Sequence, residues 1–286
     1  MDVLFFTDIL LSFIALIYLL VACFEDIKKR EIHDWLSFSL IAIALAVRAI
    51  VSLSIKKPFY FLYSLLALGI FYAVALLLYY AKAFGGGDAK FLIALSVVFA
   101  TTPKFSLLQE PFLFTFVVNS IVLSFFYVLF FSFFLAVKNR KGFAVEFKKE
   151  NRKGFLLKVS LFFLGLLFII LSFIFSPSFL IFSLVFFALP YLYFFVKAVE
   201  NSCLIKKVKP SQLREGDWLV ESVKIKGKII RPSVHGLSEK EIGFLKKARK
   251  SVRIKEGIPF IPVYLISVIV SFFANLLELF LGQPLF

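Results

Sequence analysis

Two groups of acidic residues lie beside long apolar stretches, where ionised side chains are rare. The first group, CFEDIKKREIHDWL at residues 23–36, carries four acids: Glu25, Asp26, Glu31 and Asp34. The second is FGGGDAKF, residues 84–91, where Asp88 follows three consecutive glycines. A charge near hydrocarbon costs about 2.5–3.5 kcal/mol on insertion scales, so these acids need a partner or a function. Two carboxyl groups brought close together share one proton, and such a pair can activate a water molecule.

The three glycines before Asp88 support two interpretations. An extended peptide substrate must bring its backbone close to catalytic carboxylates. Gly85, Gly86 and Gly87 would allow that approach as substrate-binding positions, and would permit dihedrals that other residues avoid. Asp88 would then begin a helix, where unpaired N–H groups and the dipole favour negative charge. The stretch also fits a plain interhelical turn with Asp88 as N-cap. The residues alone leave both interpretations open.

Membrane-spanning helices must position these acids. Of 286 residues, 61% are hydrophobic and 18% charged, and the apolar residues come in blocks long enough to cross a bilayer, which takes about 20 residues. The blocks predict spans at 3–24, 35–55, 58–81, 89–103, 111–137, 155–176, 178–199 and 259–282. The fourth is the weakest, because polar residues interrupt it from Thr101, and a short or tilted helix is expected there. The fold class is therefore a polytopic α-helical membrane protein with about 6–8 transmembrane helices.

The distribution of lysine and arginine predicts the orientation. With the N-terminus outside and every span crossing, the short inside loops 25–34, 82–90 and 138–158 hold 13 Lys and Arg, against 4 outside. Both acidic groups then face the cytoplasm, separated by two crossings, and can converge when the helices bundle. The net charge of +15 suits anchoring at an anionic lipid surface and does not indicate nucleic-acid binding. We expect a multi-pass protein of the cell membrane.

One polar segment, residues 200–258, predicts a small mixed α/β cytoplasmic subdomain before the last helix. GDWLVESVKIKGKIIRP, from Gly216, alternates polar and apolar residues and predicts a hairpin. SEKEIGFLKKARK opens with Ser238 and Glu241 in capping-box spacing and predicts a short helix. The chain is thus expected to divide into a catalytic transmembrane bundle, a basic loop with further helices, this subdomain and a C-terminal transmembrane helix, at residues 1–137, 138–199, 200–258 and 259–286.

Other residues offer little chemistry. Cys23 and Cys203 form no CxxC pair, so neither a metal site nor a cofactor is expected. The two histidines suggest no catalytic arrangement, and the motifs G-x-S-x-G and H-E-x-x-H do not occur. The acids near the outer ends of spans are expected to reach lipid headgroups: Asp2, Asp8 and Glu278.

Several motifs resemble one family. GGGD fits the GxGD signature of membrane aspartyl proteases, and GGGDAK resembles its prepilin-peptidase form. The run from Asp26 is similar to the family pattern D-x5-[IL]-P-D, with His33 where proline is frequent. GIPFIPVYLIS, residues 257–267, resembles the late Pro-rich apolar segment, and HGLSEKEIGFL resembles the C-terminal extension of archaeal preflagellin and prepilin peptidases. The chain therefore resembles the type IV prepilin peptidase family of GxGD proteases.

This resemblance implies an aspartic endopeptidase that removes a short basic leader of the class III type from preflagellin (archaellin) or type IV pilin-like precursors. It implies Asp26 and Asp88 as the catalytic pair, with Gly85 and Gly87 as motif glycines. Cleavage would take place at the cytoplasmic membrane face. The expected partners are those precursors and membrane lipids, without nucleic acid. Because 10 residues separate the first two spans and no CxxC occurs, the insertion of the bifunctional enzymes is missing and methyltransferase activity is not expected.

Two other classes of membrane protein could carry acids in this arrangement. A presenilin-like or signal-peptide-peptidase-like protease shares GxGD, and an ion- or proton-coupled transporter could use the same acids. Successive helical side chains point about 100° apart, so only one of Glu25 and Asp26 should face Asp88. Asp34 is expected to be an N-cap or a substrate-charge contact, and a basic leader could be attracted by Glu25, Glu31 or Asp34.

Overall fold

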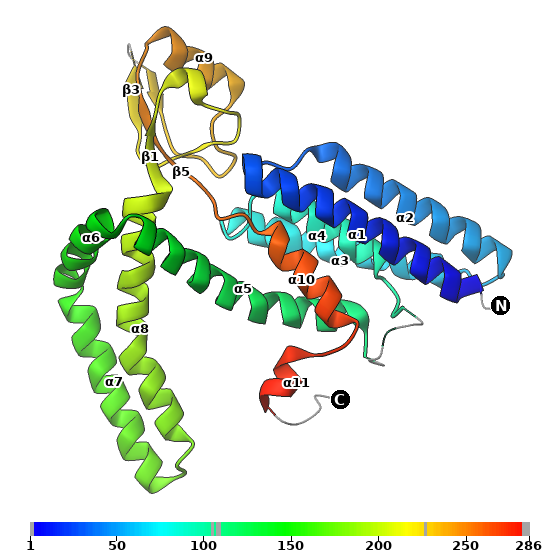
Figure 1. Cartoon of the computed structure of the whole chain (residues 1–286), viewed down its shortest axis with the longest axis horizontal. Coiled ribbons are helices and arrows are strands. Elements are labelled where there is room, and N and C mark those ends of the chain that lie inside the picture. The colour runs from blue at the N-terminus through cyan, green and yellow to red at the C-terminus, as the bar shows by residue number, and fades with distance from the viewer. Residues whose placement is uncertain (1–2, 104–105, 107–109, 226–227, 282–286) are drawn as a thin grey trace. The chain divides into compact units, whose positions relative to one another are not determined.

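The computed structural model describes residues 3–103, 106, 110–225 and 228–281 (Figure 1). The sequence prediction for Asp2 and the predicted end of the last helical segment, residues 282–286, lie outside this part of the chain. The chain forms two compact units, residues 1–128 with 257–286, and residues 129–256.

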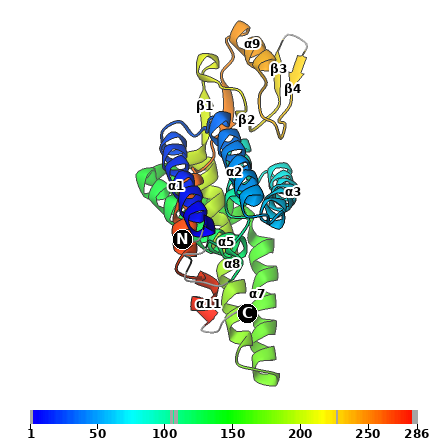
Figure 2. The ribbon, with the colours of Figure 1, turned by 90° about the vertical axis from the view of Figure 1, so that its right-hand side faces the viewer.

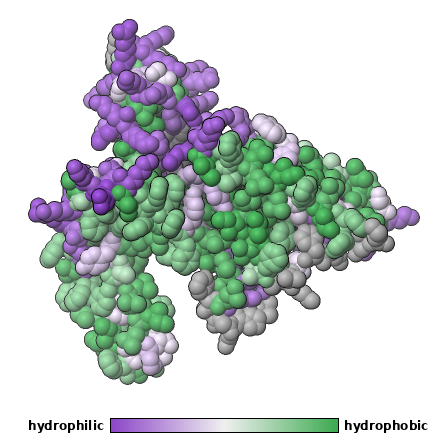
Figure 3. Space-filling model, viewed as in Figure 1, coloured by the Kyte–Doolittle hydropathy of each residue, from purple (hydrophilic) through white to green (hydrophobic). Residues whose placement is uncertain are grey.

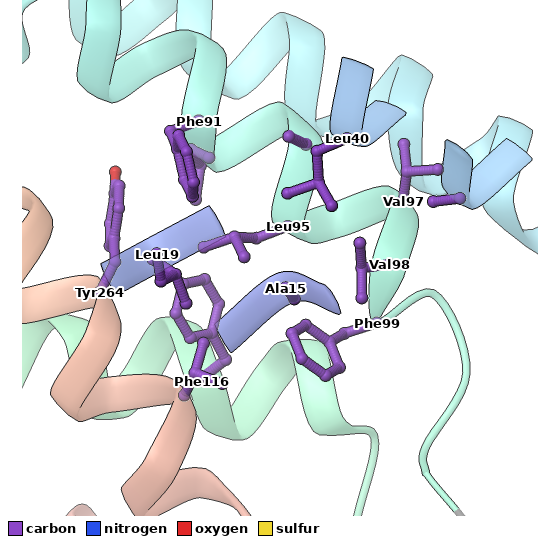
Figure 4. Packing of buried hydrophobic residues seen from close by; sticks show 14 of the residues in the cluster. Ala15, Leu19, Leu40, Phe91, Leu95, Val97, Val98, Phe99, Phe116 and Tyr264 are labelled. Carbon is purple, nitrogen blue, oxygen red and sulfur yellow. The ribbon is translucent and has the colours of Figure 1, made fainter. Parts of the chain in front are cut away.

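The first unit is a helical bundle built around a short central helix. Its helices are α1 (Val3–Lys29), α2 (Asp34–Ser54), α3 (Phe59–Tyr80), α4 (Gly86–Val98), the first part of α5 (Phe112–Lys138), α10 (Ile261–Ser271) and α11 (Leu276–Leu281). Helix α4 packs against α1, α2 and α3, and α10 packs against α1. Figure 2 shows α1, α2 and α3 nearly end-on. Side chains of α1, α2, α4, α5 and α10 form one apolar core, part of which appears in Figure 4.

The second unit combines a helical hairpin with the small α/β subdomain. After the end of α5 come α6 (Arg140–Lys153), α7 (Phe155–Ile174), α8 (Phe179–Val199), the π-helical turn η1 (Glu200–Leu204), β1 (Ile205–Val208), the 3-10 turn η2 (Pro210–Gln212), β2 (Trp218–Leu219), β3 (Val223–Ile225), β4 (Lys228–Ile230), α9 (Glu239–Lys247) and β5 (Val252–Lys255). An antiparallel sheet has the order β1-β5-β2, and β3 pairs with β4. The predicted hairpin and the Ser238–Glu241 capping box of α9 are confirmed.

Six of the described helices are long and apolar enough to cross a bilayer: α1, α2, α3, α5, α7 and α8 with its extension to Leu204. Their outward faces carry large exposed apolar side chains such as Phe13, Leu77 and Phe173, the last 86% exposed. Figure 3 shows apolar surface over the long helices and hydrophilic surface over the α/β subdomain. Water would penalise so much exposed apolar surface, whereas lipid would not. The protein is a polytopic α-helical membrane protein.

Of two predicted spans, one is confirmed as a short helix and the other is interrupted. The 13 residues of α4 extend about 20 Å, short of the roughly 30 Å hydrocarbon core, so the predicted span at 89–103 is a short helix. The continuous helix predicted at 259–282 is wrong, because α10 ends at Ser271 and α11 begins at Leu276.

Asn119 explains the break between α10 and α11. Its fully buried amide nitrogen donates to Ser271 Oγ at 2.9 Å and to the Ala274 carbonyl at 2.8 Å. Its carbonyl oxygen accepts the Leu276 N–H at 2.8 Å. One side chain of α5 therefore satisfies backbone groups on both sides of the break, which would otherwise be costly in an apolar setting.

The acids expected at lipid headgroups have partners inside the protein. Asp8 is 5% exposed and accepts a hydrogen bond from the Tyr60 hydroxyl at 3.4 Å. The buried guanidinium of Arg48 lies over the Tyr60 ring at 4.7 Å and donates to the Val98 carbonyl at 2.7 Å. Glu278 forms a side-chain hydrogen bond with Glu110. The headgroup expectation is therefore wrong for Asp8, which is buried and stabilised by protein groups, and it stays a prediction for the partly exposed Glu278.

Candidate active site

Asp26 lies in the last turn of α1, against the start of α10. Its side chain is buried, and its Oδ2 accepts the Ile261 backbone N–H at 3.0 Å. The Phe260 backbone N–H is a second donor to the same carboxylate. Pro262 in the first turn of α10 favours the helix start, where N–H groups lack partners within the helix. The first turn of α10 is therefore a binding site for the ionised form of Asp26.

Asp88 lies in the first turn of α4, as its sequence context predicts. Its Oδ2 accepts the Gly85 backbone N–H at 3.2 Å, which is one half of a capping box. Gly85 is the N-cap residue and Asp88 the third helical residue, so the N-cap interpretation of Asp88 is wrong in detail. A carboxylate here is stabilised by the helix start whatever else it does.

The fold brings the two acids together from segments 62 residues apart in the chain. Asp88 lies outside the six long apolar helices, and its burial together with the nearby Asp26 carboxylate raises its pKa to about 7. Arg30, one turn after Asp26, interacts with that carboxylate, and its guanidinium donates to the Gly257 carbonyl. Because Asp26 has two backbone donors and a nearby cation, it is the member favoured in the ionised form. Asp88 is the member favoured in the protonated form.

The glycines of FGGGDAKF have ordinary backbone conformations. Gly85 has φ −70° and ψ 161°, and among the described glycines a positive φ occurs only at Gly216 and Gly236. The expectation that this stretch needs unusual dihedrals is therefore wrong. Gly87 instead allows close packing, because a Cβ there would lie 3.0 Å from Ile32 Cδ1. A Cβ on Gly86 would lie 3.8 Å from the Tyr79 ring, which is an ordinary contact.

Glu25 and Asp34 of the first group interact with neighbouring basic side chains. Glu25 contacts His33 Nδ1 at 2.7 Å and accepts the His33 backbone N–H at 3.3 Å. Asp34 is the first residue of α2 and contacts Lys90 Nζ at 2.6 Å, while His33 holds the N-cap position. Asp26 is thus the buried acid of the Glu25–Asp26 pair. The Asp34–Lys90 ion pair ties the loop after α1 to α4, beside the Gly87–Ile32 contact.

Sequence reasoning missed the contribution of α10. The Pro-rich character of residues 257–267 marked the segment, but no feature of the pattern revealed that its backbone N–H groups bind Asp26. Tyr264, one turn further along α10, is 1% exposed and interacts electrostatically with Asp88. Among the described residues, no cluster of three or more His, Cys, Asp and Glu side chains could hold a metal ion. The chemistry available here is that of two carboxyl groups sharing a proton.

Helices and site together define a multi-pass membrane protein with paired carboxyl groups at one end of its first unit. Residues 13–138, which include both acids, match the model of the type IV leader peptidase family. The match covers 126 of the 286 residues, so it is a similarity of this segment to that family. The prepilin peptidase EppA of Methanothermobacter thermautotrophicus is 27% identical over 157 residues, 51% of this chain and 41% of the relative, so the match spans about two fifths of that relative's length. No solved structure matches the chain significantly.

Proposed function

We propose that this protein is a membrane aspartyl endopeptidase that cleaves the leader peptide of pilin-like or archaellin precursors. Two similarities support leader cleavage: residues 13–138 match the model of the type IV leader peptidase family, and the chain is similar to a prepilin peptidase. The observation that carries the two-aspartate mechanism is the interaction of the Asp26 and Asp88 carboxyl groups.

The reaction begins with Asp26 ionised and Asp88 protonated. Asp26 takes a proton from a water molecule, whose oxygen attacks the scissile carbonyl carbon, while Asp88 donates its proton to the carbonyl oxygen. The tetrahedral intermediate collapses as the amide nitrogen receives a proton from Asp26 and the C–N bond breaks. The developing acid returns its hydroxyl proton to Asp88, which restores the starting protonation. Every proton moves between the two carboxyl groups, the water and the peptide.

We also propose the side of the membrane on which the site lies and the kind of peptide that it receives. The site is proposed to lie at the cytoplasmic face of the cell membrane, with the N-terminus outside, which the excess of lysine and arginine in the loops 25–34, 82–90 and 138–158 supports. A substrate with a short basic leader before its apolar helix would present the cleavage site at this level. Gly85, Gly86 and Gly87 are proposed to contact its backbone. No methyltransferase activity is proposed.

The test is cleavage of a pilin or archaellin precursor by membranes that contain the wild type, Asp26→Asn or Asp88→Asn. Each substitution keeps the side-chain shape but removes the titratable oxygen, so each should lower cleavage by about 10²–10⁴-fold, the contribution attributed to one acid–base group. Glu25→Gln, next to Asp26, is the matched control and should retain cleavage. Full activity in either aspartate variant would refute the assignment of that residue.

A further inference from the structure

Tyr264 presents a buried hydroxyl that forms no hydrogen bond with any described residue. The residue is 1% exposed, and its hydroxyl oxygen has no hydrogen-bond partner among the described residues. A buried donor left unpaired is unfavourable, and native structures rarely contain one without a reason. A phenylalanine would fill the same space without that cost, so the hydroxyl calls for an explanation.

The ring of Tyr264 is held firmly by aromatic neighbours. Its centroid lies 5.2 Å from Phe260, 6.2 Å from Phe84 and 5.8 Å from Phe116. Figure 4 shows the ring beside Phe91 of α4, with the hydroxyl pointing away from Phe116. These contacts use the ring alone, and they fix the direction of the hydroxyl without bonding to it.

The hydroxyl lies within electrostatic range of Asp88, whose carboxyl group has one backbone donor, the Gly85 N–H. Asp26, by contrast, has the Ile261 and Phe260 N–H groups. One segment, residues 260–264, therefore reaches both acids, Asp26 through its backbone and Asp88 through a tyrosine. The hydroxyl is suited to the moment at which Asp88 loses its proton, because only then is that carboxyl group purely an acceptor.

We propose that Tyr264 is a positioning residue, whose hydroxyl donates a hydrogen bond to the Asp88 carboxylate as that group gives up its proton. This inference rests on the proposed function of the aspartate pair. The hydrogen bond stabilises the ionised form and fixes the orientation of its two oxygens. Removing the donor should therefore raise the pH at which Asp88 ionises.

Other charged and titratable groups surround the pair and stay unchanged in the test. Among the described residues near the pair they include Cys23, Asp26 and Arg30 of α1 and its end, Asp34 of α2, Tyr79 of α3, Lys90 of α4 and Tyr127 of α5. Substituting Tyr264 alone leaves these groups in place, so a change in the pH at which Asp88 ionises would report the loss of the hydroxyl.

The experiment compares Tyr264→Phe with the wild type in two readouts. The first is the pH profile of kcat/KM on a fluorogenic peptide with a lysine-rich leader and the start of an apolar helix. The alkaline limb, where Asp88 ionises, should move upward by about one pH unit, since a hydrogen bond to a charged group has about that effect. The second is infrared titration of the carboxyl C=O band that Asp88→Asn removes, which should show the same shift without needing activity.

Tyr60→Phe is the matched control, because Tyr60 is also buried in the first unit but contacts Asp8 instead. Its profile and its carboxyl titration should match the wild type. An unchanged or lower midpoint in Tyr264→Phe, with folding verified by thermal melting, would overturn the proposal. Failure of the wild type to cleave any precursor would refute the protease assignment instead. In that case the infrared titration still decides whether Tyr264 bonds to Asp88.

Discussion

Replacing Gly87 with alanine tests why the glycine-rich stretch is needed. The added Cβ would lie 3.0, 3.2 and 3.4 Å from Cδ1, Cβ and Cγ1 of Ile32, closer than ordinary carbon contacts. Ile32 is partly buried against the apolar core, so it has little room to retreat. Overpacking of this kind costs about 1–3 kcal/mol, and alanine returns at most about 1 kcal/mol through helix propensity. We expect Gly87→Ala to lower the free energy of unfolding by about 1–2 kcal/mol.

The assay is thermal unfolding in a mild detergent together with cleavage of a precursor. Gly86→Ala is the matched control, because its Cβ would meet only the Tyr79 ring at 3.8 Å. It should melt at or slightly above the wild-type temperature. Gly87→Ala combined with Ile32→Ala should recover part of the loss, since two of the three close contacts disappear. Equal melting temperatures for the two glycine variants would refute the packing argument. Loss of cleavage in both variants at wild-type stability would assign the glycines to substrate backbone contact instead.

Two further predictions concern stability. The pKa of Asp88 is raised from 3.8 to about 7 in the fold, so its contribution to stability should be fully present below pH about 4 and lost as the pH rises through about 7. Between pH 4 and 8, the melting temperature of the wild type should therefore fall more steeply than that of Asp88→Asn. Parallel curves for the two proteins would contradict this. Asn119→Ala removes three hydrogen bonds, including those to the Ala274 carbonyl and the Leu276 N–H, and should cost about 1–3 kcal/mol in thermal unfolding. Asn139→Ala, which removes one exposed hydrogen bond to the Ser202 carbonyl, should melt like the wild type, and equal losses in both would count against the role of Asn119.

The position of each acid along its helix could be inferred from the sequence, but its partners could not. The end of one apolar block placed Asp26 at a helix terminus, and the glycines placed Asp88 at the next helix start. Burial, which distinguishes Asp26 from Glu25, depends on which face of α1 meets α10. That face is decided by contacts with residues more than 230 positions away, so no local pattern carries it.

The partners of Asp8, near the outer end of its helix, could not be inferred from the sequence either. The sequence predicts a headgroup contact for Asp8, because the residues three and four positions away on its own helix include no lysine, arginine or tyrosine. Tyr60 of α3 and Arg48 of α2 supply the polar environment only after three helices pack. A buried polar group is satisfied in three dimensions, and helical periodicity gives no information on the neighbouring helix.

By itself, the sequence determined the membrane class, the two helix termini that carry acids, the hairpin and the capped helix of the α/β subdomain. These follow from apolar length, lysine and arginine distribution and turn chemistry, which act within a few residues of the chain. Tertiary structure alone decided that the last apolar block breaks beside Asn119, and that the first turn of α10 holds Asp26. Those features depend on hydrogen bonds and packing between distant segments, and such interactions exist only in the folded chain.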